Sequence, residues 1–113
     1  MTDMKLEDFQ RICSINELND NIGRRFILND IDIAVFLIKQ RVFALSNICP
    51  HLQTTLIYDG FIEDNYVVCP VHGWKFDLET GKTPSGSNGL RVFETKVVEN
   101  EVYVKVNQKK FNW

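Results

Sequence analysis

Short apolar runs, separated by two or three polar residues, follow one another along most of the chain. Runs of this length bounded by polar pairs are typical of antiparallel strands joined by tight turns. The pattern predicts strands at residues 9–12, 24–28, 31–38, 42–45, 61–62, 66–68, 92–98 and 102–106. Because no long helical pattern competes with them, we expect an all-β fold, an antiparallel sandwich or barrel.

Three local patterns refine this expectation. In the segment 31–38, residues 33, 35 and 37 fall on one face of a strand and residues 34, 36 and 38 on the other. Both sets are apolar, which predicts a strand buried on both sides. Ser14 and Glu17 have the spacing of a capping box, and Gly23 leaves room for only about one turn of helix after them. The segment 81–89 contains three glycines and a proline, which predicts a surface loop.

The length and charge of the chain limit its class. With 113 residues and a net charge of −2, it has the size of one domain and is neither a basic nucleic-acid binder nor an acidic disordered tail. We expect a single domain over residues 1–113, with a core at about 9–106 and short tails. No apolar run reaches the roughly 18 residues that span a bilayer. The first ten residues do not resemble a signal peptide, and three cysteines make a poor disulfide framework, so we expect a reducing cytoplasm.

Both histidines of the chain lie next to cysteines, at the ends of predicted strands. Cys49 and His51 follow the strand that ends near residue 45, and Cys69 and His72 follow the strand 66–68. The two pairs could therefore meet at one end of the sheet. A single tetrahedral zinc ion is one interpretation, but the one-residue gap between Cys49 and His51 is tight for a single ion. A dinuclear site, in which two thiolates hold one iron and two imidazoles hold the other, removes that difficulty.

The residues around the pairs suit such loops. Pro50 and Pro70 follow the two cysteines and bring no N–H that needs a partner. Gly73 follows the second histidine and can take a positive φ where the loop turns back.

These two boxes, 47–51 and 69–77, together with the continuation 78–81, resemble the cluster-binding boxes of Rieske-type ferredoxins. The resemblance extends from about residue 9 to 106. It implies a β-sandwich with a small cluster-binding subdomain formed by two loops, and one 2Fe-2S cluster. It implies that Cys49 and Cys69 bind one iron, that His51 and His72 bind the other, and that Pro50, Pro70, Gly73 and Trp74 support the loops. Gln53 stands where family members often have glycine, which leaves the path of the first loop open.

The resemblance also implies a function, that of an electron carrier and not an enzyme. Both histidines are used by the cluster, so none remains for a mononuclear iron centre, and no nucleotide-binding motif is present. We expect a soluble carrier that passes single electrons from a flavin- or NAD(P)H-dependent reductase to a terminal oxygenase, with partners docking near the cluster loops. The small subunit of an NAD(P)H-dependent nitrite reductase is an alternative. A non-redox module, binding zinc or no metal, is an alternative of another class.

Further interpretations concern the third cysteine and the residues in and around these boxes. Cys13 matches neither box and is expected to be a small buried hydrophobic residue. Trp74 and Phe76 are interpreted as packing supports for the second loop. Neither can offer the hydroxyl that high-potential Rieske proteins carry at these places, so we expect a low-potential cluster. The segment 42–74 holds three acidic residues and no lysine or arginine, which predicts a basic docking patch on the partner.

Overall fold

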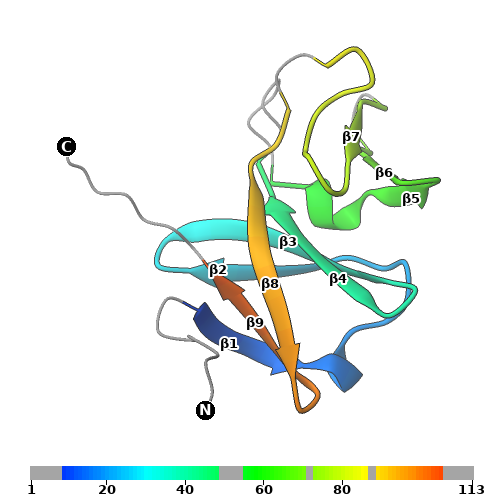
Figure 1. The fold of residues 1–113 in the computed structure, drawn as a ribbon. Coiled ribbons are helices and arrows are strands. Elements are labelled where there is room, and N and C mark those ends of the chain that lie inside the picture. Colours follow the sequence, from blue (N-terminus) through cyan, green and yellow to red (C-terminus); the bar gives the residue numbers. More distant parts are fainter. Residues whose placement is uncertain (1–8, 49–54, 71–72, 87–88, 106–113) are drawn as a thin grey trace.

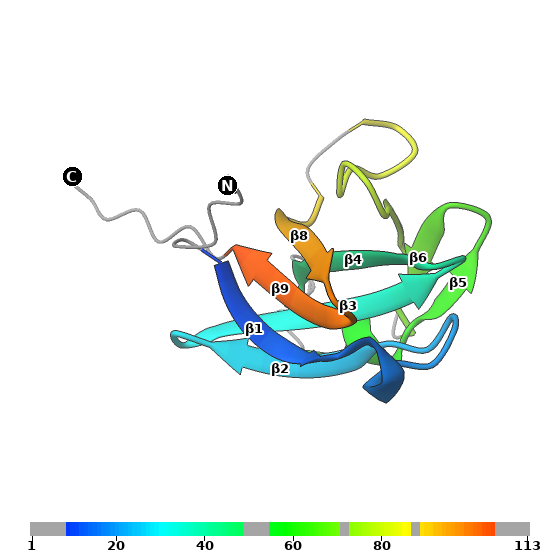
Figure 2. The same cartoon turned by 60° about the horizontal axis from the view of Figure 1, so that its bottom comes forward.

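A six-stranded antiparallel sheet, here called the large sheet, forms most of the fold (Figure 1). The computed structural model describes residues 9–48, 55–70, 73–86 and 89–105. The strand order is β1-β9-β8-β4-β3-β2, with bounds β1 Phe9–Ser14, β2 Arg24–Leu28, β3 Ile31–Ile38, β4 Arg41–Ser46, β8 Val92–Val98 and β9 Glu101–Lys105. The start of β8 pairs with β4 and the rest of it pairs with β9, so the sheet curls toward a barrel (Figure 2). The predicted all-β sandwich or barrel is confirmed.

Tight turns explain why these strands pair as neighbours. The β2–β3, β3–β4 and β8–β9 hairpins each turn through two residues with positive φ, at Asn29–Asp30, Lys39–Gln40 and Glu99–Asn100. Turns of this kind match the right-handed twist of the strands that they join. The capping box is also confirmed: Ser14 and Glu17 cap the 3-10 helix η1 (Ile15–Glu17), which connects β1 to the loop before β2.

A second, three-stranded sheet, here called the small sheet, lies at one end of the large sheet (Figure 1). Its order is β5-β6-β7, with β5 at Phe61–Glu63, β6 at Tyr66–Val68 and β7 at Lys75–Asp77. A single turn of 3-10 helix, η2 (Ile57–Asp59), precedes it. The sequence pattern did not predict β7 or η2, because each is three residues long and each buries only one side chain.

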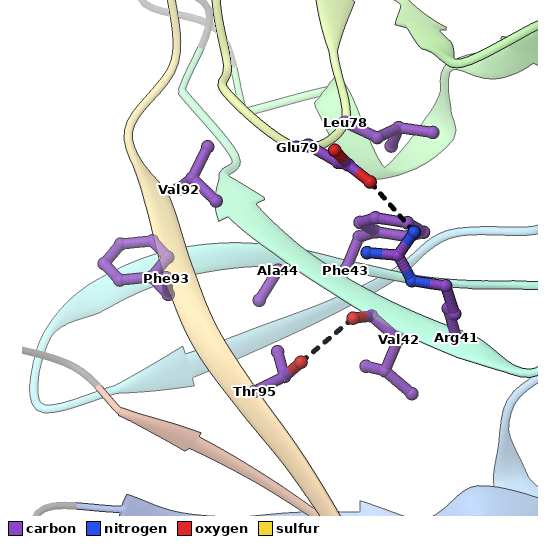
Figure 3. Close-up of a pocket in the computed structure, with 9 residues that line it drawn as sticks. All are labelled: Arg41, Val42, Phe43, Ala44, Leu78, Glu79, Val92, Phe93 and Thr95. Carbon is purple, nitrogen blue, oxygen red and sulfur yellow. Dashed lines mark hydrogen bonds and ion pairs between the residues drawn. The ribbon is translucent and has the colours of Figure 1, made fainter.

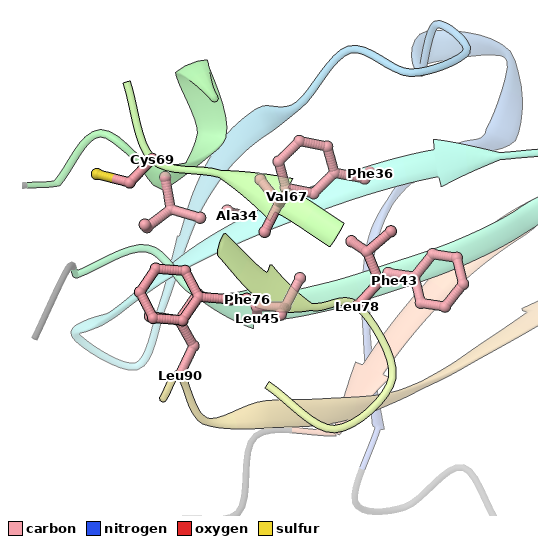
Figure 4. Close-up of a cluster of buried hydrophobic side chains, with 10 residues drawn as sticks. Ala34, Phe36, Phe43, Leu45, Val67, Cys69, Phe76, Leu78 and Leu90 are labelled. Carbon is pink, nitrogen blue, oxygen red and sulfur yellow. The ribbon is translucent and has the colours of Figure 1, made fainter. Parts of the chain in front are cut away.

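The strand β3 is buried on both faces, as its pattern predicted. Ile33 and Val35 belong to an apolar cluster inside the large sheet, which also takes in Cys13, Phe93 and Val102. On the other face, Ala34 and Phe36 pack against the small sheet, in a second cluster that we call the seam. The seam joins residues of β3 and β4 to Ile57, Val67, Cys69, Phe76, Leu78 and Leu90 (Figure 4). The expected burial of Cys13 is confirmed.

A polar contact at the edge of the seam adds to this join. Arg41 of β4 donates a hydrogen bond to Glu79, the second residue after β7, at 2.8 Å, beside a shallow hollow of about 320 Å³ (Figure 3). At the same hollow, but within the large sheet, Thr95 of β8 donates to the carbonyl of Val42 of β4 at 2.9 Å. The Arg41–Glu79 pair is exposed, and exposed pairs contribute little free energy, so the apolar seam carries the association of the two sheets.

The chain from Asn47 to Arg91, which carries the small sheet, is inserted between two strands that pair directly. The strands β4 and β8 pair at Ala44–Phe93 and Leu45–Val92. The N–H of Ser46 donates to the carbonyl of Arg91 at 2.8 Å, so the insert leaves and re-enters the large sheet at neighbouring points. In the described part of the chain, no helix has the length and apolar character to cross a membrane.

Candidate metal centre

The β6–β7 hairpin carries the second predicted box in its loop. Cys69 directly follows β6, and its N–H donates to the carbonyl of Trp74 at 2.8 Å. The N–H of Gly73 donates back to the carbonyl of Cys69 at 2.9 Å. These two bonds close the loop 70–73 at its base.

Gly73 has the positive φ that its place in the box predicted, at 73°. A Cβ built on Gly73 would meet no atom within 4 Å, so glycine serves the backbone conformation here and not a close contact. Pro70 is exposed at the start of the loop. The positive φ that the sequence predicted for Gly73 is therefore confirmed.

The thiol of Cys69 is buried at the end of the seam and takes no part in a disulfide. Figure 4 shows its sulfur at the edge of the cluster, directed away from the ring of Phe76. Phe76 itself is fully buried in the seam, which agrees with its interpretation as a packing support. Trp74 differs, because its side chain is 39% exposed.

The first box begins directly after β4, and its base is held by a buried amide. Asn47 has no solvent-exposed surface. Its Nδ2 donates to the carbonyl of Thr55 at 3.0 Å and to Oδ1 of Asp32 at 2.9 Å. Its Oδ1 accepts the N–H of Tyr58 at 2.8 Å. Thr55 follows the segment 49–54, so one side chain joins the two ends of the first loop.

Behind Asn47 lies an ion pair between neighbouring strands. Arg25 of β2 forks onto the carboxylate of Asp32 of β3, with Nη2 to Oδ2 at 2.6 Å and Nε to Oδ1 at 2.9 Å. The hydrogen bonds from Arg25 and then from Asn47 lower the pKa of Asp32 below its usual value. Asp32 is therefore ionised at neutral pH and accepts from both neighbours.

The bases of the two loops lie side by side. Tyr58, which is bonded to Asn47, belongs to η2, and Gly60 follows that helix. A Cβ on Gly60 would lie 2.3 Å from the carbonyl of Val68, the residue before Cys69. The backbone that leaves the first loop thus passes directly against the backbone that enters the second.

Four of the predicted site residues, Cys49, Pro50, His51 and His72, lie outside the described residues. The described ones, Cys69, Pro70, Gly73 and Trp74, share one hairpin loop. Asn47 belongs to the first box, but no role was predicted for it, nor for Asp32 or Arg25. The sequence did hold a signal for Asn47, because an asparagine that directly follows a buried strand needs hydrogen-bond partners if it is buried too.

Comparisons with known proteins identify the family. Residues 8–105 match the family described as the Rieske-like 2Fe-2S domain. The chain belongs to this family. The Rieske domain is 30% identical over 108 residues to the "Anthranilate 1,2-dioxygenase ferredoxin subunit" of Burkholderia cepacia, covering 94% of this chain and 99% of that protein.

Two solved structures are similar to this Rieske domain. One is a chain of the "Complex of reduced oxygenase and oxidized ferredoxin in carbazole 1,9a-dioxygenase", with a TM-score of 0.75, 28% identity and coverage of 84% of this chain and 99% of that one. The other is a "putative NADH-dependent nitrite reductase small subunit from Mycobacterium tuberculosis", with a TM-score of 0.84, 20% identity and coverage of 89% and 96%. At that identity the second likeness shows the fold alone.

The cofactor of the Rieske domain is one 2Fe-2S cluster. The described residues fit it. Cys69 offers a buried sulfur at the base of a hairpin loop, and a thiolate is the form in which cysteine binds iron. The neighbouring loop base is fixed by Asn47, so two loops can face one site. When bound, the cluster supplies one-electron redox chemistry.

Proposed function

We propose that this protein is a one-electron carrier that takes electrons from a flavin- or NAD(P)H-dependent reductase and passes them to a terminal oxygenase. The observation that carries the proposal is the likeness, over 99% of its length, to a dioxygenase ferredoxin subunit. The 28% identity to a chain of an oxygenase–ferredoxin complex supports the same role. We propose one Rieske domain over residues 1–113, with its core at about 9–106, and a cytoplasmic location, which the odd cysteine count supports.

The proposed ligands are one cysteine and one histidine from each loop. Cys49 and Cys69 would hold one iron, and His51 and His72 would hold its neighbour. The buried thiol of Cys69 at the base of one loop and the adjoining base of the other support a single site for both loops, and the division of the ligands between the irons follows from the resemblance to Rieske-type ferredoxins. Pro50, Pro70, Gly73 and Trp74 would support the loops.

The described rim of the site suits a partner surface. Ile48 is 41% exposed at the start of the first loop, and Trp74 is 39% exposed at the end of the second. Apolar side chains that remain exposed next to a site are the kind that a protein partner covers. We therefore place the docking surface around the two loops.

Metal content and electron count test this function directly. The protein is purified without oxygen and assayed for iron, zinc and acid-labile sulfide. It is then titrated with dithionite while its ultraviolet–visible absorption is recorded. We expect two irons and two sulfides per chain and uptake of one electron. A colourless protein containing zinc would instead establish the non-redox module.

A nitrite reductase small subunit is the second candidate, favoured by the fold likeness to such a subunit. Both cysteine–histidine boxes are intact in this sequence, whereas small subunits of that class often lack the ligands, so the carrier is the preferred assignment. Oxidation of the dithionite-reduced protein by the terminal oxygenase of a ring-hydroxylating dioxygenase system would support the carrier. A stable complex with a nitrite reductase large subunit, without electron exchange, would support the alternative.

A further inference from the structure

The amide of Asn47 has a single orientation that its surroundings impose. Its Nδ2 faces two acceptors, the carboxylate of Asp32 and the carbonyl of Thr55. Its Oδ1 faces one donor, the N–H of Tyr58. A flipped amide would face acceptor with acceptor and donor with donor, so the network fixes which atom lies where. The side chain is buried, its Nδ2 donates at 2.9 and 3.0 Å, and its Oδ1 accepts at 2.8 Å.

The partners of Asn47 belong to three different parts of the fold. Thr55 ends the first loop, Tyr58 lies in η2, and Asp32 lies in β3 of the large sheet. The N–H of Asn47 also donates to the carbonyl of Asp32 at 3.0 Å. The side chain therefore ties the loop exit to the large sheet at a point two residues from Cys49.

We propose that Asn47 is a positioning residue for the 2Fe-2S cluster, and that the Arg25–Asp32 pair holds its amide in place. The inference rests on the proposed ligand set, in which Cys49 and His51 belong to the loop that Asn47 closes. Asn47 touches no ligand in the described structure, so it acts through the loop. Residues that orient ligands without binding metal tune both affinity and potential.

Charge explains why asparagine suits this place and aspartate does not. A carboxylate at position 47 would direct one oxygen at the ionised Asp32 and at the carbonyl of Thr55, where the amide now donates. Two buried carboxylates facing each other repel, and a carboxyl group that takes up a proton has one donor where the amide has two. Asn47→Asp is thus nearly isosteric but loses at least one of the contacts to Asp32 and Thr55, and leaves the one to Tyr58.

The test compares Asn47→Ala and Asn47→Asp with two matched controls in the cluster-loaded protein. Val102→Ala removes buried volume from the apolar side chains inside the large sheet, on the face of β3 away from the seam. Asn19→Asp makes the same charge change as Asn47→Asp, but at an exposed site. The readouts are the rate of iron release to a chelator, the midpoint potential and the g values of the reduced cluster. We expect release at least about tenfold faster in both Asn47 variants, with shifted potential and g values. The controls should keep the wild-type potential and g values even where Val102→Ala lowers the unfolding midpoint.

Asp32→Asn keeps the inference testable if the Asn47 variants fail to assemble. This change leaves an oxygen for Nδ2 but removes the charge onto which Arg25 forks, so we expect a smaller change in the same direction. Wild-type release rates, potential and g values in all loaded variants would overturn the inference, as would equal changes in Val102→Ala. The proposed function fails separately, when the wild-type protein itself lacks the Rieske spectrum.

Discussion

Each of the two boxes in the sequence holds one cysteine and one histidine among the proposed ligands, and Cys13 belongs to neither box. Cys13 is buried in β1, inside the large sheet, on the side of β3 that faces away from the seam. Cys69 lies in the seam at the start of the second loop. The two described cysteines therefore differ in environment, and the position of Cys13 makes it a control for the proposed ligands.

Replacing either histidine by alanine tests the ligand set. His51→Ala and His72→Ala each remove an imidazole, so we expect loss of the Rieske absorption and of the reduced-state signal. Ligand binding is coupled to loop folding, so amide exchange near Asn47 and Gly73 should also become faster. Cys13→Ala should keep a full complement of iron, measured in the same preparations. Bleaching by Cys13→Ala but not by Cys69→Ala would show that the ligand set is wrong.

The midpoint potential should lie at the low end of the Rieske range, roughly −150 mV. Hydrogen bonds to the cluster sulfurs raise the potential, and neither Trp74 nor Phe76 has a hydroxyl to donate. The change Trp74→Ser together with Phe76→Tyr should raise it where the new hydroxyls reach the sulfurs. The single variant Phe76→Tyr keeps the indole of Trp74, so it separates the effect of a new hydroxyl from the effect of losing the indole. Protein-film voltammetry at pH 7 measures both, and a wild-type midpoint well above zero contradicts the assignment.

Among the strands, the hairpins of the large sheet could be predicted from the sequence, whereas in the small sheet β5 and β6 could be predicted and β7 could not. Hairpin signals are local, since two polar residues between apolar runs specify a tight turn. The strand β7 has one buried residue, Phe76, and depends on pairing with β6 and on the seam. The pairing of β1 with β9 joins the two ends of the described chain, and no local pattern reports it.

The same distinction separates what could be predicted of the site from what could not. The cysteine–histidine boxes are recognisable because ligand chemistry demands those residue types at fixed spacing. The anchoring of the loops depends on partners far away in the sequence, such as Asp32 for Asn47 and the carbonyl of Val68 for Gly60. Residues of this kind look like ordinary polar or small residues until the fold brings their partners to them.

Two glycines with the same backbone conformation should respond differently to substitution. Gly81 has φ of 78°, and a Cβ there would lie 1.9 Å from the carbonyl oxygen of Leu90. Gly73→Ala should cost about 1 kcal/mol, for the left-handed backbone alone. Gly81→Ala should cost about 3 kcal/mol, because backbone must also move. Urea unfolding at matched cluster content gives both values, and equal costs would refute the predicted close contact.

For the whole molecule, the structure sharpens the prediction of electrostatic steering. Two of the three acidic residues of the segment 42–74, Glu63 and Asp64, lie at the β5–β6 turn, at the opposite end of β6 from Cys69. Glu63 also pairs with Lys75 at 3.6 Å. Asp59 lies in η2, which is bonded to the base of the first loop, and it is exposed. Asp59 is therefore the described acid of that segment best placed to steer a partner.

Stopped-flow oxidation by a cytochrome c, a basic one-electron acceptor, tests this steering. We expect the association rate to fall as salt rises through the screening range, because the attraction is between exposed charges. Asp59→Asn should lower the low-salt rate more than Asp64→Asn, although both remove one charge. A rate that does not change with salt would exclude steering, and equal effects of the two variants would exclude the assignment to Asp59.

The insertion of residues 47–91 between two paired strands has a consequence for how such proteins can diversify. Because Ser46 and Arg91 are bonded neighbours, the insert can be exchanged for one of another length without moving the strands that hold it. Only the contacts between the insert and the large sheet have to be kept. These are the apolar packing of the seam and the hydrogen bond between Asp32 and the residue that follows β4. The redox unit and the rest of the frame can then change separately over evolution, and a chimera spliced at these two points should take its potential from the parent of the insert as long as the frame keeps Arg25 and Asp32.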